Sequence, residues 1–218
     1  MRGNLLTTIN YKMIWGQKVK MPENNKKEFK KESRISWDEF FMQIAVAATK
    51  RTACIHHKVA SVFVDDLHRT ISIGYNGPTR GDVHCNEVGC AKVHGDPITG
   101  EIKRCRGIHS EINAIINAGD VNQLRGSTLY ITVFPCYDCM KALNNLGVKK
   151  IIYLNEYLRI LDGSDGKAKE AEPESKELAV KRGIICEQFR FQESDKKKEI
   201  NEVKDSPNNE EDEKNKRF

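Results

Sequence analysis

Hydrophobic positions recur at helical spacing in four stretches of the chain, and local signals mark where these helices begin or end. Ser36 and Glu39 form a capping box at the start of the first helix. Gly119 and Gly147 follow the second and third stretches, where glycine commonly ends a helix. The predicted helices span 36–48, 109–119, 136–146 and 172–182, and the expected buried positions are Trp37, Phe40, Phe41, Ile44, Ala45 and Ala48 in the first, Ile112, Ile115 and Ile116 in the second, and Met140, Leu143 and Leu146 in the third.

Between these helices lie short runs of branched and apolar residues bounded by turn-forming residues, which is the pattern of β-strands. The polar turn 65–69 joins two of the runs as a hairpin. Strands that alternate with helices favour an α/β layered fold with a mixed sheet. The predicted strands span 59–64, 70–75, 127–133, 150–154 and 184–191, and residues 82–107 are expected to be irregular.

The same pattern divides the 218-residue chain into three parts. Residues 35–191 hold almost all of the apolar periodicity and have the size of a normal single domain. Residues 1–34 are rich in Lys and Asn, carry a net charge of +6, and are expected to be a flexible basic arm with Met13 and Met21 as alternative starts. Residues 192–218 contain three hydrophobic residues and are expected to be a disordered charged tail.

Composition excludes several classes of protein. No run approaches the roughly 18 apolar residues of a membrane-spanning helix, and the N-terminus lacks the apolar core of a secretory signal. The part 35–191 carries a net charge of only +1, which gives no global electrostatic footprint for a nucleic acid. The chain has seven cysteines, an odd number, so we expect a cytoplasmic location and metal binding rather than disulfides.

The strongest chemical signal joins two predicted helix starts. His109-Ser-Glu111 opens one helix, and Pro135-Cys136-Tyr-Asp-Cys139 opens the next. The two cysteines are three residues apart, so their thiols project from one face of a helix, and His109 can supply a third ligand. Three protein ligands that leave a position for water are typical of a catalytic zinc site, where Glu111 is expected to act as the proton shuttle. A structural zinc site with a chance His-x-Glu is the alternative.

Four motifs resemble the deoxycytidylate (dCMP) deaminase family, including its bacterial late-competence type. They are Gly74-Tyr-Asn-Gly77, His84-Cys85-Asn-Glu-Val-Gly-Cys90, Gly107-Ile-His-Ser-Glu-Ile-Asn-Ala-Ile115, and Pro135-Cys-Tyr-Asp-Cys139 followed by Ile151-Ile-Tyr153. His-x-Glu with Pro-Cys-x-x-Cys marks the zinc deaminases of nucleobases as a whole. The Gly-Tyr-Asn-Gly loop and the Cys-rich insert point to the dCMP branch. The resemblance covers residues 36–190.

This resemblance implies a cytidine deaminase-like three-layer fold, in which helices flank a central mixed β-sheet. It implies zinc-dependent hydrolysis of dCMP to dUMP and ammonia, which supplies dUMP for thymidylate synthesis, and a homohexamer activated by dCTP and inhibited by dTTP. The chain departs from the family at Ser110, where alanine is usual, and at Lys58-Val-Ala-Ser61, where a Val-Gly-Ala run is usual. A small residue is kept at position 110, so we expect little effect there.

The remaining cysteines suggest a second metal ion. Four of them precede the predicted catalytic helix, and three of these flank the irregular insert. A structural zinc would explain how an insert with few apolar residues becomes ordered, and the resemblance favours it because some members of the family have a second zinc. His84 and His94 are substitute ligands if one cysteine is not used, and the alternative is a set of free thiols. The four cysteines are Cys54, Cys85, Cys90 and Cys105.

Two further residues are candidate contacts to the substrate. Asn76 could hydrogen-bond the sugar hydroxyl, or it could only tolerate a left-handed turn before Gly77. Tyr153 could stack on or gate the pyrimidine, or it could be ordinary core. The candidate partners of the phosphate, each of which could equally be a solvated surface charge, are Arg80, Arg104 and Arg106.

Two other functions stay open on sequence alone. The same chemistry could act on a free base, a nucleoside or a tRNA, although the near-neutral domain argues against tRNA. Alternatively, the domain could be a non-catalytic, zinc-stabilised binding module. Glu111 argues against the binding module, because a purely structural zinc needs no proton shuttle.

Overall fold

The computed structural model describes residues 11–20, 34–160 and 169–191, and the chain divides into two units between Arg34 and Ile35. The first unit contains a β-hairpin of β1 (Tyr11–Ile14) and β2 (Gln17–Lys20). Its turn has positive φ angles of 53° at Trp15 and 77° at Gly16. The sequence pattern did not predict this hairpin, because a bulky residue such as tryptophan is rarely left-handed. The predicted tail, 192–218, lies outside the described residues, and the three-part division stays a prediction.

The second unit is built on one five-stranded sheet, with strands in the order β11–β8–β7–β3–β4. Strands β11, β8 and β7 are parallel to one another, and β3 is antiparallel to both of its neighbours. The predicted α/β class with a mixed sheet is therefore confirmed. The strands are β3 (Ala60–Val64), β4 (Thr70–Tyr75), β7 (Thr128–Val133), β8 (Lys150–Asn155) and β11 (Ile185–Gln188).

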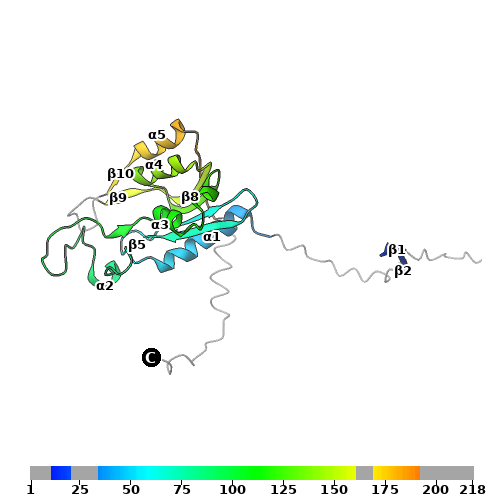
Figure 1. Cartoon of the computed structure of the whole chain (residues 1–218), viewed down its shortest axis with the longest axis horizontal. Helices are drawn as coiled ribbons and strands as arrows, with labels where there is room; N and C mark the ends of the chain where they lie inside the picture. The colour runs from blue at the N-terminus through cyan, green and yellow to red at the C-terminus, as the bar shows by residue number, and fades with distance from the viewer. Residues whose placement is uncertain (1–10, 21–33, 161–168, 192–218) are drawn as a thin grey trace, which may run out of the picture. The chain divides into compact units, whose positions relative to one another are not determined.

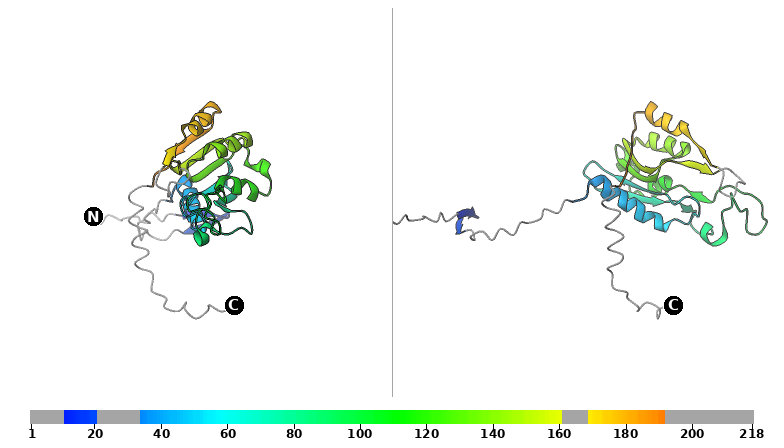
Figure 2. Two further views of the ribbon diagram at one scale, coloured as in Figure 1. Left: turned by 90° about the vertical axis from the view of Figure 1, so that its left-hand side faces the viewer. Right: turned by 180° about the vertical axis from the view of Figure 1, so that it is seen from behind.

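Alternate residues of the central strands β3, β7 and β8 enter two separate hydrophobic cores, which gives this unit three layers. On β3, Phe63 joins one core and Val62 joins the other. Helix α1 covers the Val62 face of the sheet, and helices α3, α4 and α5 cover the Phe63 face (Figures 1 and 2). Within the described residues, none of the helices is long and apolar enough to cross a membrane. The helices are α1 (Trp37–Ala48), α3 (Ser110–Asn117), α4 (Tyr137–Leu146) and α5 (Pro173–Lys181).

Local capping signals in the sequence correctly predicted the start of α1 and the end of α4. Ser36 Oγ accepts a hydrogen bond from the Glu39 amide at 3.1 Å and caps α1. Gly147 follows α4 in the left-handed conformation, as predicted. The end of α3 differs, because this helix stops at Asn117 and does not reach Gly119.

The buried faces of α1 and α3 differ from the predicted ones. Trp37 and Phe40 are 53% and 41% exposed, and the Trp37 ring stacks on the surface residue His68 at 4.5 Å. Met42, which did not fit the predicted apolar face, is fully buried. In α3, Ile116 is 66% exposed, and the buried side chains are small or polar. Those buried side chains are Ser110, Glu111 and Ala114.

Close packing against the sheet explains the unusual buried face of α3. A Cβ atom on Gly74 of β4 would lie 2.2 Å from both the Ser110 carbonyl oxygen and the Ala114 amide nitrogen. Glycine therefore lets the helix lie directly on the strand. Large apolar side chains on this face would separate the two elements, so α3 presents small and polar side chains to β4.

Helix α3 also binds the outer strand of the sheet through two side-chain amides. Asn113 Nδ2 donates a 2.8 Å hydrogen bond to the Tyr75 carbonyl, and Asn117 Nδ2 donates a 2.9 Å bond to the Ile73 carbonyl. Both acceptors belong to β4, the last strand in the sheet order. These bonds tie the helix that begins at His109 to the sheet edge.

The long connection between β4 and α3 carries the Cys-rich insert. Its ends pair as a short ladder of β5 (Gly77–Pro78) and β6 (Gly107–Ile108), and it contains one helical turn, α2 (Cys85–Val88). Asp96 organises a turn by accepting two backbone N–H bonds and a 2.9 Å bond from Lys103 Nζ. The remaining short elements are η1 (Thr49–Arg51), η2 (Val121–Leu124), β9 (Leu158–Ile160) and β10 (Lys169–Ala171).

Candidate active site

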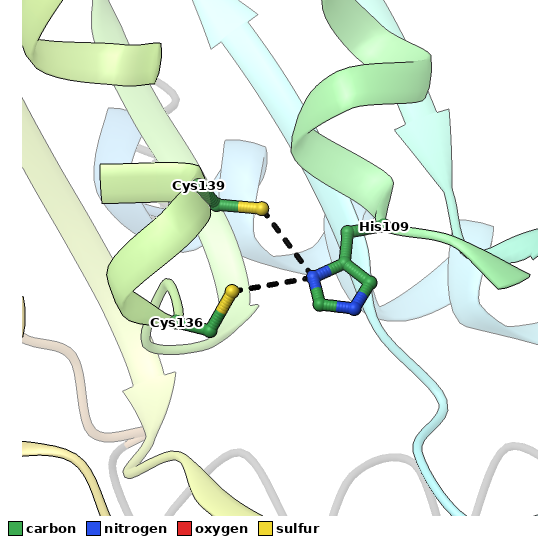
Figure 3. A group of neighbouring side chains, drawn as sticks. All are labelled: His109, Cys136 and Cys139. Atoms are coloured by element: carbon green, nitrogen blue, oxygen red, sulfur yellow. Dashed lines mark hydrogen bonds between the residues drawn. The ribbon is translucent and has the colours of Figure 1, made fainter. Parts of the chain in front are cut away.

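The three side chains expected to hold the catalytic zinc come together where two helices begin. His109 directly precedes α3, Cys136 directly precedes α4, and Cys139 lies in the first turn of α4. His109 Nδ1 lies 3.3 Å from Cys136 Sγ and 3.4 Å from Cys139 Sγ (Figure 3). All three ligand atoms lie within 4.8 Å of one another. The structure thus forms the cluster that the spacing predicted, with Cys136 as the cap of its helix.

Contacts with the core fix the segment that carries the two cysteines. Ser175 of α5 is buried, and its hydroxyl donates a 2.7 Å hydrogen bond to the Pro135 carbonyl. The Cys136 carbonyl accepts the Met140 amide at 2.9 Å and closes the first turn of α4. Because the Met140 side chain is fully buried, this turn is anchored in the core and both thiols are held toward α3.

Mutual hydrogen bonds prepare these side chains as ligands. The Cys139 thiol and the His109 ring both hydrogen-bond Cys136, which lowers the pKa of Cys136 to about 4. The same contact with Cys136 raises the pKa of His109 to about 9. These contacts favour the thiolate form of Cys136 and the protonated form of His109. A metal ion that binds here must displace the remaining ligand protons.

The donor set fits a zinc ion. Zinc prefers thiolate sulfur and imidazole nitrogen, and sites with three protein ligands typically keep the fourth position for water or substrate. Both cysteines are buried, whereas His109 is exposed, and His109 and Cys136 line a cavity. The cluster therefore has the chemistry and the access that a catalytic zinc requires.

Glu111 also lines this cavity. Its side chain is 4% exposed, and this burial raises the pKa of its carboxyl group. Ser110 Oγ donates a 3.0 Å hydrogen bond to Glu111 Oε2, and the Ser110 and Ser61 hydroxyls lie 2.8 Å apart. A carboxyl group with a raised pKa is better able to take up and return a proton near neutral pH.

Of the two candidate substrate contacts, the structure brings Asn76 to the cavity and leaves Tyr153 in the core. Asn76 Oδ1 accepts the Val59 amide at 3.0 Å, and its side-chain amide donates to the His57 carbonyl. Asn76 is not left-handed, so the turn interpretation is wrong. Tyr153 packs in the core beneath α4 and α5, and its hydroxyl donates to Glu156 Oε1 at 3.1 Å. A role for Tyr153 at the substrate therefore gains no support from its position.

Two aromatic residues that the sequence pattern did not single out line the cavity. Phe134 directly follows β7, and Tyr157 follows β8. Both lie outside regular elements, so no periodicity marks them. Their position was the available signal, because ligands of open α/β sheets bind beyond the carboxyl ends of parallel strands.

The four remaining cysteines of the predicted second site line the same cavity. Among residues 11–20, 34–160 and 169–191, the cluster at His109 is the only group of three potential ligands that meets the 4.8 Å spacing. Cys54 Sγ and Cys105 Sγ each accept a backbone N–H bond at 3.3 Å, and His94 Nδ1 accepts the Cys90 amide at 3.1 Å. The second zinc stays a prediction.

The cavity lacks the arginines that were considered as phosphate partners. None of the three is among the described residues that line it. Arg106 instead donates a 3.0 Å hydrogen bond to the Gly89 carbonyl within the insert, and Arg80 and Arg104 are exposed.

Known proteins resemble this chain over the region that forms the site. Residues 35–155 match the family described as the cytidine and deoxycytidylate deaminase zinc-binding region. A deoxycytidylate deaminase of Schizosaccharomyces pombe is 37% identical over 125 residues, which are 57% of this chain and 38% of that protein. ComE operon protein 2 of Bacillus subtilis is 30% identical over 161 residues, which are 73% of this chain and 75% of that protein. The match thus spans less than half of the Schizosaccharomyces pombe protein.

The fold of this chain also resembles that of a solved deaminase. The crystal structure of a dCMP deaminase from the cyanophage S-TIM5 in complex with dCMP and dUMP superposes with a TM-score of 0.53 at 25% identity. That likeness covers 72% of this chain and 99% of the cyanophage chain, and it confirms the predicted cytidine deaminase-like fold. The family match extends over both helix starts and all three candidate zinc ligands. The chain therefore belongs to the cytidine and deoxycytidylate deaminase family.

Proposed function

We propose that this protein hydrolyses dCMP to dUMP and ammonia, with a zinc ion held by His109, Cys136 and Cys139. The observation that carries the proposal is the convergence of these ligands and the buried Glu111 carboxyl group at one cavity. Relatives named deoxycytidylate deaminase, and the cyanophage enzyme crystallised with dCMP and dUMP, support the choice of substrate. The dUMP formed in this reaction would be available for thymidylate synthesis.

In this reaction water replaces the exocyclic amine at C4 of cytosine, so protons must move from the water to the base. Zinc, when bound, supplies a Lewis acid that activates the water. Glu111 accepts a proton from the water and delivers it to ring atom N3, and it then carries the proton of the hydroxyl group added at C4 to the departing amine as the C4–N bond breaks. The amine thereby leaves as ammonia and not as an amide-like anion, which is a very poor leaving group.

The lining of the cavity offers two kinds of contact to a nucleotide. Phe134 and Tyr157 line the cavity and are the candidate aromatic contacts to a pyrimidine. The side-chain amide of Asn76 has two N–H donors, and one of them bonds the His57 carbonyl. The second donor can bind the sugar hydroxyl, while the bonds to His57 and Val59 hold the side chain in place.

A structural zinc on the four cysteines that precede α3 is part of the proposal. All four line the cavity, and the pKa of the Cys85 thiol is raised by burial and by the neighbouring Cys90. Burial also raises the pKa of the Cys105 thiol. Buried thiols in one another's field gain most when a cation replaces their protons. The proposed ligands are Cys54, Cys85, Cys90 and Cys105.

The family resemblance extends the proposal to assembly and regulation. A homohexamer, activated by dCTP and inhibited by dTTP, is expected by that resemblance. All seven cysteines are free thiols, which suits a cytoplasmic location. Sedimentation of the purified protein with and without each nucleotide tests the assembly, and initial rates under the same conditions test the regulation.

The substrate is tested by assaying the purified, zinc-loaded protein against a panel. The panel contains dCMP, dCTP, deoxycytidine, cytosine, guanine and a tRNA adenosine stem-loop. We expect ammonia release with dCMP to be the fastest and to match dUMP formation. Faster turnover of another member would reassign the substrate, whereas no turnover of any member would favour the non-catalytic binding module.

A further inference from the structure

Two buried serines form a hydrogen-bonded chain that ends on Glu111. Ser61 on β3 and Ser110 on α3 are both fully buried. Their hydroxyl oxygens lie 2.8 Å apart, and Ser110 Oγ donates a 3.0 Å hydrogen bond to Glu111 Oε2. The sequence suggested that serine at position 110 would have little effect, but its hydroxyl contacts the carboxyl group expected to move protons.

The donors and acceptors of this chain have one consistent order. A hydroxyl has a single proton, and the Ser110 proton is used in the bond to Glu111 Oε2. The proton between the two serines therefore comes from Ser61, which donates to Ser110 Oγ. Each hydroxyl in the chain donates once, so both buried O–H groups are satisfied and both point toward Glu111.

The backbone brings the two serines together. Ser61 lies opposite Gly74 in the β3–β4 register. A Cβ atom on Gly74 would lie 2.2 Å from the Ser110 carbonyl, so this glycine permits the approach that joins the hydroxyls. The arrangement depends on three small residues on three adjacent segments and is closed to solvent.

We propose that Ser110, supported by Ser61, is a positioning residue that holds the Glu111 carboxylate in one orientation for proton transfer. This inference rests on the proposed function of Glu111. A hydrogen bond to one carboxylate oxygen restricts rotation of the carboxylate group. The group is then already oriented when the reaction begins and need not reorient. The binding of substrate depends on other residues of the cavity, so loss of the bond should lower kcat and leave KM unchanged.

The test is a set of serine-to-alanine variants assayed with the substrate that the wild-type protein turns over fastest. Ser110→Ala should lower kcat about tenfold, or about 1.4 kcal/mol in activation free energy, with KM changed less than about twofold. Ser61→Ala should lower kcat about threefold, because Ser110 keeps its bond to Glu111. Ser127→Ala is the matched control, since Ser127 is buried and donates a 2.6 Å bond to the Leu124 carbonyl, and its kcat should not change.

The double variant Ser61→Ala/Ser110→Ala separates positioning from stability. Ser110→Ala alone leaves the buried Ser61 donor without its acceptor, which lowers the thermal unfolding midpoint of the metal-free protein. Removing both hydroxyls should restore much of that midpoint but should leave kcat as low as in Ser110→Ala. A kcat that recovers together with the midpoint, or a Ser110→Ala kcat equal to wild type, would overturn the positioning role.

Failure of the proposed function gives a different result. If the wild-type protein forms no dUMP, the substrate assignment fails, and the variants are compared on whichever panel member it deaminates. If it deaminates none, crystal structures of the wild-type protein and Ser110→Ala decide, because the positioning role requires the Glu111 carboxyl group to change orientation in the variant. An unchanged carboxyl group overturns the role whatever the substrate.

Discussion

The zinc cluster at His109 and the Cys-rich insert border one cavity, yet different forces hold them. The cluster is carried by helix starts whose next turns are buried, as Ala114 and Met140 show at 0% exposure. The insert contains a small apolar cluster of Cys90 and Val93 and is otherwise organised by polar contacts such as the turn at Asp96. The hydrophobic core of the domain therefore sets the geometry of the first site. In the insert, a metal ion would supply the order that apolar packing does not.

Removing one ligand from each region should separate them most strongly. Cys139→Ser keeps the size of the side chain but removes a zinc ligand, so dUMP formation should fall below detection while the fold persists. The measurements are zinc content per chain by mass spectrometry, initial rates, and circular dichroism. Substantial turnover in this variant would contradict the assignment of the cluster as the catalytic site.

The corresponding change in the insert is Cys85→Ser with Cys90→Ser. The wild-type chain should hold about two zinc ions, and this variant should hold about one. The insert should also become more sensitive to proteolysis, because its ordering metal is lost. A wild-type chain with one zinc, unchanged by the two substitutions, would refute the second site and leave the first intact.

The next largest effect should come from the buried carboxyl group. Glu111→Gln keeps the shape of the side chain and leaves the zinc ligands untouched, so zinc content should persist. Turnover should fall by at least roughly 10²–10⁴-fold, since general acid–base assistance is typically worth that much. Glu87→Gln, an exposed change in the insert, is the control and should not alter the rate. Near-normal dUMP formation by Glu111→Gln would disprove the mechanism.

A pair of glycine substitutions compares how tightly each region is packed. Gly74→Ala places a methyl group against the backbone of α3 and should lower the free energy of unfolding by about 3 kcal/mol. Gly107→Ala, at the end of the insert, meets Cys105 Sγ at 3.4 Å and the Gly77 carbonyl oxygen at 4.0 Å, and it should change the free energy of unfolding by less than about 0.5 kcal/mol. Urea denaturation of both variants measures the difference. Equal losses would mean that the two regions are packed alike.

The smallest effect should be a pH dependence confined to the insert. The bond from Lys103, with two backbone N–H bonds, holds the pKa of Asp96 below its usual range. A carboxyl group with a lowered pKa stabilises the folded state above its unfolded pKa of about 4, and this contribution is lost as the pH falls through the lower folded value. Hydrogen exchange of the Ile98 and Thr99 amides should therefore lose protection below about pH 4 in the wild-type protein. Asp96→Asn should remove this dependence, and identical profiles would contradict it.

Features set by nearby residues could be predicted from the sequence. The cap at Ser36, the glycine after α4, and the spacing of the two cysteines each involve a few consecutive residues. The strands could be predicted because their apolar runs are bounded by turn residues, and the sheet class followed from their alternation with helices. The zinc ligands could be predicted because they flank two helix starts, and the hydrophobic pattern predicted both of those starts.

Features that depend on which surfaces meet could not be predicted in the same way. The buried face of α3 is polar because Gly74 allows a close approach, and only the β3–β4 pairing shows that Ser61 lies beside it. Tyr153 and Phe134 share one core, yet Phe134 lines the cavity and Tyr153 does not, and Tyr157 lines it from a segment without periodicity. The order of the strands is needed before any of these positions can be assigned.

The two amide bonds from α3 to β4 also bear on how the protein avoids uncontrolled association. An exposed edge strand offers carbonyl and N–H groups to which a strand of another molecule can add, and this is a common route to aggregation. Asn113 and Asn117 occupy two carbonyls of that edge, and α3 carries both side chains. A foreign strand would have to displace these amides from the helix that begins at His109. The helix that follows the candidate zinc ligand His109 therefore also protects the β4 edge of the sheet.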